Sequence, residues 1–98
     1  MQFAYYNSGK KKIILTNNTL VPVIASFDCD GTCTPLYFRY TYADDSSESV
    51  KIDKIVFRKP NSCFGTIFCC QVTVSDCSQT IYLFYHDEER KWYLRDHS

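Results

Sequence analysis

The stretch VPVIASFDCDGTCTPLYFRYTY, from Val21 to Tyr42, decides the fold of this chain. It consists of an apolar run, a short acidic segment that contains a glycine, and a second apolar run rich in aromatic residues. Asp-Gly between two such runs is a strong signal for chain reversal. The stretch therefore predicts a β-hairpin, with Leu20–Phe27 as its first strand and Asp28–Pro35 as its turn.

The second arm of this hairpin, Leu36–Tyr42, alternates between two sets of residues as a half-buried strand does. The set predicted to face inward consists of Leu36, Phe38, Tyr40 and Tyr42. Tyr37 and Arg39 fall on the opposite side of the same strand. Tyrosine and arginine are enriched where proteins contact partners, so this outward side is a candidate binding face.

Four further strand-like runs follow: Val50–Lys59, Thr66–Ser75, Thr80–His86 and Lys91–Arg95. Within the first run the apolar residues change parity at Asp53-Lys54, which predicts a β-bulge. The last two runs form a predicted hairpin in which Trp92 and Leu94 face inward. No run shows the apolar period of an amphipathic helix over the length that a helix needs.

The predicted fold is all-β, a small single-domain antiparallel barrel or sandwich of about six or seven short strands. The whole chain, residues 1–98, is expected to form one domain, since 98 residues suffice for a single core. Residues 1–20 are expected to be a peripheral N-terminal strand or extension, with Gln2–Asn7 as a short edge strand.

The charge composition gives no support for long-range attraction to nucleic acid or to an anionic membrane. Lysine plus arginine equals aspartate plus glutamate at eleven each, so the formal net charge is zero. The N-terminal residues lack the pattern of a secretory signal, and no apolar run is long enough for a spanning helix. The expected location is the cytoplasm, with no membrane association.

Six cysteines occur in the chain: Cys29, Cys33, Cys63, Cys69, Cys70 and Cys77. In a reducing compartment, cysteine acts mainly as a small apolar residue, so free thiols are favoured over disulfides. Cys70 is in phase with Val72 and is expected in the core, whereas Cys69 points the other way. The pair Cys29 and Cys33 has loosely permissible zinc spacing, but a second pair is missing, so no metal or cofactor is expected.

The segment Asp28-Cys29-Asp30-Gly31-Thr32 after an apolar strand resembles the first motif of the haloacid dehalogenase phosphatases. That resemblance implies Asp28 as nucleophile, Asp30 as general acid and base, and Thr32 as part of the motif. The phosphatase fold, however, is a parallel sheet whose crossovers each need a dozen or more residues. Here another strand follows within a few residues, so the phosphatase interpretation is disfavoured.

A second resemblance covers most of the chain after residue 26. The residues that carry it are Phe27-Asp28, Gly31, Pro35-Leu36, Ile52-Asp53-Lys54-Ile55, Gly65, Val72, Tyr82-Leu83-Phe84-Tyr85 and Trp92-Tyr93-Leu94. This pattern resembles a set of small uncharacterised bacterial proteins, seen mainly in Firmicutes. The resemblance implies a shared β fold with Asp28 and Gly31 as turn residues, and it implies no activity.

The function predicted from the residues is a non-catalytic binding or protein-interaction module that uses a sheet face or an edge strand. The candidate binding residues are aromatic and basic side chains on the predicted outward parity: Tyr37, Arg39, Tyr82, Phe84 and Tyr93. The alternative is a small barrel that binds single-stranded nucleic acid, stacking bases on exposed aromatics. The sequence leaves the partner and the oligomeric state open.

Overall fold

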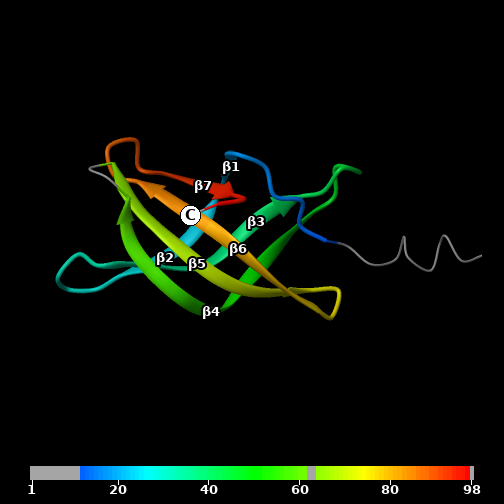
Figure 1. The fold of residues 1–98 in the computed structure, drawn as a ribbon, viewed down its shortest axis with the longest axis horizontal. Helices are drawn as coiled ribbons and strands as arrows, with labels where there is room; N and C mark the ends of the chain where they lie inside the picture. The colour runs from blue at the N-terminus through cyan, green and yellow to red at the C-terminus, as the bar shows by residue number, and fades with distance from the viewer. Residues whose placement is uncertain (1–11, 62–63, 98) are drawn as a thin grey trace, which may run out of the picture.

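Residues 12–61 and 64–97 are described in a computed structural model, where they form one curled antiparallel sheet (Figure 1). Its strands are β1 (Thr19–Val21), β2 (Val23–Phe27), β3 (Cys33–Thr41), β4 (Ser47–Asn61), β5 (Gly65–Val74), β6 (Cys77–His86) and β7 (Lys91–Arg95). The all-β prediction and its number of strands are confirmed. The predicted strand Gln2–Asn7 lies outside the described residues.

The sheet order is β1-β7-β6-β5-β4-β3-β2, so the two strands at its ends are consecutive in the chain. Only Pro22 separates them, and the chain changes its pairing partner there from β7 to β3. Proline has no N–H to donate, although the carbonyl of Pro22 still accepts the Arg39 N–H at 3.0 Å. The predicted single strand Leu20–Phe27 is therefore divided, and the sheet is barrel-like because its ends meet at Pro22.

The long strand β4 turns the corner of the sheet, pairing first with β3 and then with β5. Its register shifts between Ile52 and Lys54 and again between Ile55 and Phe57. The first shift confirms the bulge that the sequence predicts at Asp53-Lys54. After the second shift, Phe57 is 39% exposed, whereas Ile55 is half-buried against the core.

A further bulge lies in β3 and overturns one prediction. Ile24 of β2 pairs with Tyr37, and the next residue, Ala25, pairs with Pro35, so Leu36 is the extra residue of the bulge. Leu36 is consequently 40% exposed and Pro35 is buried, so the inward orientation predicted for Leu36 is wrong. The other residues of that set, Phe38, Tyr40 and Tyr42, are buried as predicted.

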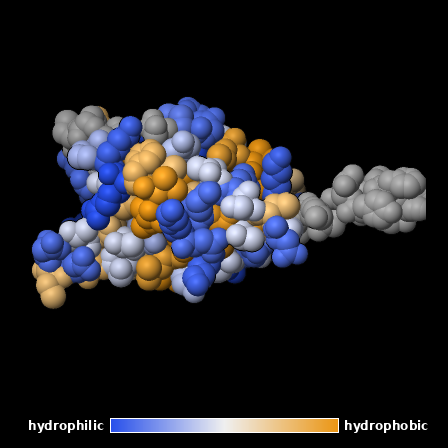
Figure 2. Space-filling view, turned by 60° about the horizontal axis from the view of Figure 1, so that its bottom comes forward, coloured by the Kyte–Doolittle hydropathy of each residue, from blue (hydrophilic) through white to orange (hydrophobic). Residues whose placement is uncertain are grey.

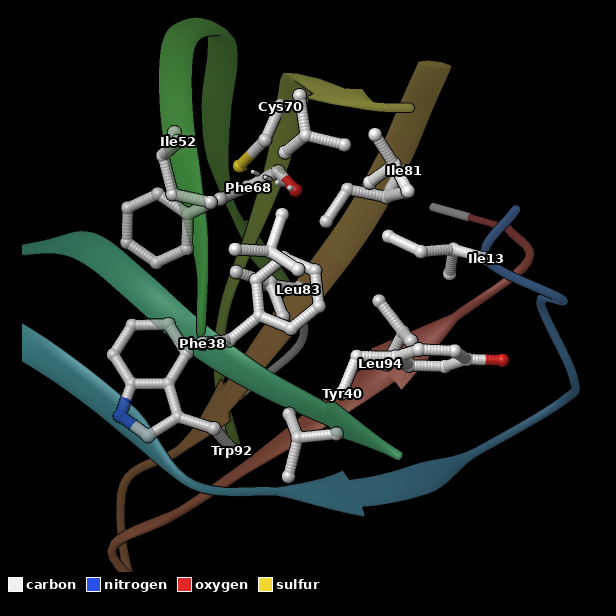
Figure 3. Packing of buried hydrophobic residues seen from close by; sticks show 14 of the residues in the cluster. Ile13, Phe38, Tyr40, Ile52, Phe68, Cys70, Ile81, Leu83, Trp92 and Leu94 are labelled. Carbon is white, nitrogen blue, oxygen red and sulfur yellow. Dashed lines mark hydrogen bonds between the residues drawn. The ribbon is translucent and has the colours of Figure 1, made fainter. Parts of the chain in front are cut away.

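The core consists of side chains from the concave side of the curled sheet, and Figure 3 shows them converging. Cys70, Trp92 and Leu94 lie in it as predicted. Ile13, from the irregular segment before β1, is also fully buried and lies on the side of the cluster away from Trp92 (Figure 3). Burying side chains of this size stabilises the fold by roughly 1.5–3 kcal/mol each.

Candidate binding cleft

The two sheet ends meet over only a short distance, and a cleft opens where they part. In the β1–β7 ladder, the residue pair nearest to Pro22 is Val21 with Trp92. Beyond Pro22 the chain leaves β7, and β2 pairs with β3 instead. The cleft between β2 and the β6–β7 hairpin measures about 640 Å³. It is lined by Leu20, Val21, Pro22, Val23, Ala25, Phe27, Tyr85, Arg90, Lys91 and Trp92. We call it the β2–β7 cleft.

The floor of the β2–β7 cleft is aromatic and is held by the core. The rings of Tyr85 and Trp92 lie 4.8 Å apart, and the Trp92 ring lies 5.6 Å from that of Phe68. Trp92 is 8% exposed, and Val23 and Ala25 beside it are half-buried. A rigid apolar floor of this kind can bury an incoming side chain without ordering flexible groups of its own.

One wall of the cleft is the edge of β2, which has a single hydrogen-bonded neighbour, β3, among the residues described. The carbonyl of Pro22 accepts from β3, and the N–H of Asp28 donates to the Thr32 carbonyl at 2.9 Å across the same hairpin. Main-chain groups alternate in direction along a strand. The N–H and C=O groups of the odd-numbered residues, Val23, Ala25 and Phe27, therefore point away from β3.

The other rim of the cleft carries two cations, Arg90 and Lys91. Neither forms a salt bridge: within residues 12–61 and 64–97, the ion pair found is that of Asp96 with His97. Arg90 has a φ of 58°, the left-handed conformation that glycine and asparagine adopt most readily. The turn thus places a guanidinium at the cleft although a smaller residue would fit its backbone better.

A smaller hollow of about 140 Å³ continues from the cleft, with Phe27 and Tyr85 lining both. Cys33, Arg58 and Asp87 also line this hollow. Burial raises the pKa of the Cys33 thiol, and the opposing effect of Arg58 is smaller. This environment favours the neutral thiol over the thiolate that a nucleophile needs.

The five residues predicted as a binding face lie on two separate surfaces. Tyr37 and Arg39 line a hollow of about 280 Å³ on β2 and β3, together with Ile24. Tyr82, Phe84 and Tyr93 lie on β6 and β7, facing away from the core. Strand order places β4 and β5 between β3 and β6 on one side, and β1 between β7 and β2 on the other.

The second group is also less accessible than the sequence suggests. Phe84 is 4% exposed, because the guanidinium of Arg95 covers its ring at 4.1 Å. Tyr93 donates a hydrogen bond to the Glu89 carboxylate at 2.7 Å, and that bond is the main cause of its raised pKa. On the face drawn in Figure 2, hydrophobic residues lie in several patches separated by hydrophilic ones.

The phosphatase-like segment forms the turn of the β2–β3 hairpin. The Asp30 carboxylate accepts the Thr32 N–H at 3.0 Å, and this bond lowers the pKa of Asp30. The Asp28 carbonyl accepts the Gly31 N–H, and Gly31 has a φ of 87°. Asp30 and Gly31 therefore have turn roles, in a hairpin instead of at the end of a parallel strand.

The cysteines Cys29, Cys33, Cys69, Cys70 and Cys77 are free. No cluster of three or more histidine, cysteine, aspartate or glutamate side chains suited to a metal occurs among the described residues. Cys69 is buried although it faces away from the core as predicted. In the part of the chain that the structure describes, no helix is long and apolar enough to cross a membrane.

Comparison with known proteins gives no match: no family model, curated protein or solved structure is detectably similar to this chain. The sequence does not predict the cleft. The sequence feature that points to it is Pro22, which lies inside the apolar run Leu20–Phe27. Proline is found at strand edges and ends, so it indicates a break in that run.

Proposed function

We propose that this protein is a non-catalytic interaction module that binds an extended segment of a partner protein in the β2–β7 cleft. The observation that carries the proposal is the main-chain edge of Val23, Ala25 and Phe27, which no other described strand pairs, beside an apolar floor. Strand addition of this kind takes its affinity from main-chain hydrogen bonds and its specificity from pockets for alternate side chains.

The composition of β2 supports this function. Natural proteins protect exposed sheet edges with charged residues, prolines or bulges that prevent pairing with other chains. The residues of β2, Val-Ile-Ala-Ser-Phe, include no charge and no proline, and the bulge of this hairpin lies in β3. Ile24 and Phe27 are also largely exposed. An unprotected apolar edge next to an apolar cleft is expected where a partner strand pairs.

The test uses Trp92, the only tryptophan of the chain, as a reporter in the floor of the cleft. The probe is a capped octapeptide that alternates valine with glutamine, which is extended, neutral and apolar on one side. We expect it to change the Trp92 emission in a saturable manner. We expect Ala25→Pro to abolish that change, because proline removes an N–H that points away from β3 and is tolerated on an edge strand.

Ala25→Ser is the matched control, because it retains the N–H and should retain the emission change. Circular dichroism and thermal unfolding show whether both variants are folded. An emission change that persists unaltered in folded Ala25→Pro would contradict strand addition.

A second candidate function is the binding of single-stranded nucleic acid at the hollow of Tyr37 and Arg39. The observation in its favour is that Tyr37 is 39% exposed and pairs with Lys51 of β4, so Arg39 and Lys51 lie on the same face of the sheet as Tyr37. It has less support than the peptide proposal, because the other predicted aromatics are on a different surface. We place either function in the reducing cytoplasm, for which the exposed free thiols of Cys29 and Cys77 are the support.

A further inference from the structure

We infer that the segment bound in the β2–β7 cleft is acidic, with carboxylate side chains alternating with apolar ones. This inference rests on the proposed function and adds the chemistry of the partner. Among the described residues that line the cleft, Arg90 and Lys91 are charged and none is a carboxylate. Since the chain as a whole has zero net charge, this excess of positive charge is local to the cleft.

Of the three acidic residues before Arg90, Glu88 does not line the cleft, and Glu89 and Asp87 face other groups. The carboxylate of Glu89 accepts the hydrogen bond from Tyr93 on the outer side of β7, and this bond is the main cause of its lowered pKa. Lys91 makes only a smaller contribution to that shift. Asp87 lines the neighbouring hollow together with Arg58. Neither rim cation forms an ion pair within the described residues, so both can interact with a charge on the partner.

The backbone of Arg90 allows its charge to be removed without straining the turn. A non-glycine residue in the left-handed region costs of the order of 1 kcal/mol relative to glycine. Arg90→Gly should therefore leave the fold intact while it removes the charge. The strand geometry then defines the ligand, because successive side chains of an extended segment point alternately towards and away from the apolar floor. The length of β2, five residues, sets the length of segment that can pair.

The experiment compares three capped octapeptides in which valine alternates with glutamate, glutamine or lysine, with Trp92 emission as the readout at low salt. We expect the glutamate peptide to bind at least about tenfold more tightly than the glutamine peptide. We expect the lysine peptide to bind most weakly. The preference for glutamate should decrease as salt is added, because rim charges are screened.

Substitutions at the rim test whether Arg90 and Lys91 cause the preference for glutamate. Arg90→Gly and Lys91→Gln should each weaken binding of the glutamate peptide, so that its affinity approaches that of the glutamine peptide. Neither substitution should change the affinity for the glutamine peptide. Lys54→Gln is the matched control, because Lys54 is an exposed cation on β4 that does not line the cleft. The affinity of Lys54→Gln for the glutamate peptide should stay within about twofold of that of the wild type.

The outcomes separate the two claims. Equal affinity for the glutamate and glutamine peptides, or tighter binding of the lysine peptide, would overturn the inference and leave the binding function standing. A glutamate preference that survives in Arg90→Gly and Lys91→Gln would also overturn it. If no peptide changes the Trp92 emission, the proposed function fails and the inference fails with it.

Discussion

The side-chain amide of Gln79 binds both backbone groups of Ile13. The Ile13 N–H donates to Oε1 at 3.2 Å, and Nε2 donates to the Ile13 carbonyl at 2.7 Å. The Gln79 side chain thus satisfies both main-chain groups of Ile13 and holds this buried residue against the core. Gln79 and Tyr85 are six residues apart in β6, so the cleft lies at the opposite end of that strand.

We expect Gln79→Ala to lower the free energy of unfolding by about 1–3 kcal/mol, because two partly buried hydrogen bonds are lost. Urea denaturation measures this change. Gln79→Glu retains an acceptor for the Ile13 N–H but cannot donate to the Ile13 carbonyl as a carboxylate, so it also destabilises. Peptide affinity at the cleft should be unaltered in folded Gln79→Ala, and a large loss there would show that the two ends of the fold are coupled.

Gly65 is predicted to be a position where any side chain lowers the stability of the fold. Its backbone lies so close to the Tyr85 carbonyl of the paired strand β6 that a Cβ would clash with main-chain atoms. We expect Gly65→Ala to destabilise the protein by roughly 2–4 kcal/mol, measured by thermal or urea unfolding. Gly31→Ala is the matched comparison: Gly31 has open space but a φ of 87°, so only about 1 kcal/mol is expected. Equal costs at both positions would contradict this account.

The sequence predicts the strands and most of the core because period-two alternation reports which side of a strand is buried. It fails at Leu36 because alternation cannot locate a bulge, which is detected only in the pairing of Ile24 and Ala25 with β3. It fails for Phe84 because an outward parity does not reveal that Arg95 covers the ring. The cleft depends on strand order and on the change of partner at Pro22, neither of which is a local property.

Cys70 is predicted to make stability fall at alkaline pH. Burial raises the pKa of its thiol from 9.0 to about 12, with a smaller contribution from Cys69. Between these values the unfolded chain has lost the proton that the folded protein retains, so the free energy of unfolding decreases as pH rises. The slope for one such group is at most about 1.4 kcal/mol per pH unit.

Urea denaturation at about pH 8 and about pH 10 measures the slope. Cys70→Ala is expected to be less stable at the lower pH, because a buried group is lost, but to show a shallower decrease. Cys77→Ala, at an exposed thiol, is the control and should retain the decrease of the wild type. An identical slope in Cys70→Ala and the wild type would contradict the prediction.

We expect labelled single-stranded oligothymidylate to show no anisotropy change when the protein is added. The protein concentrations should be those at which binding of the glutamate octapeptide is saturated. Zero net charge and the separation of Tyr37 from the other aromatic group are the reasons. Binding whose logarithm falls linearly with the logarithm of salt concentration would instead support the second function. In that case Tyr37→Ala and Arg39→Gln should weaken it.

The most direct test of the account is the backbone amide spectrum of β2 during titration with the glutamate octapeptide. Strand addition predicts an alternating response: the amides of Val23, Ala25 and Phe27 shift and become protected from hydrogen exchange. The amides of Ile24 and Ser26 face β3 and should change little. A response confined to the even-numbered residues, or shifts elsewhere with β2 unchanged, would contradict binding at this edge.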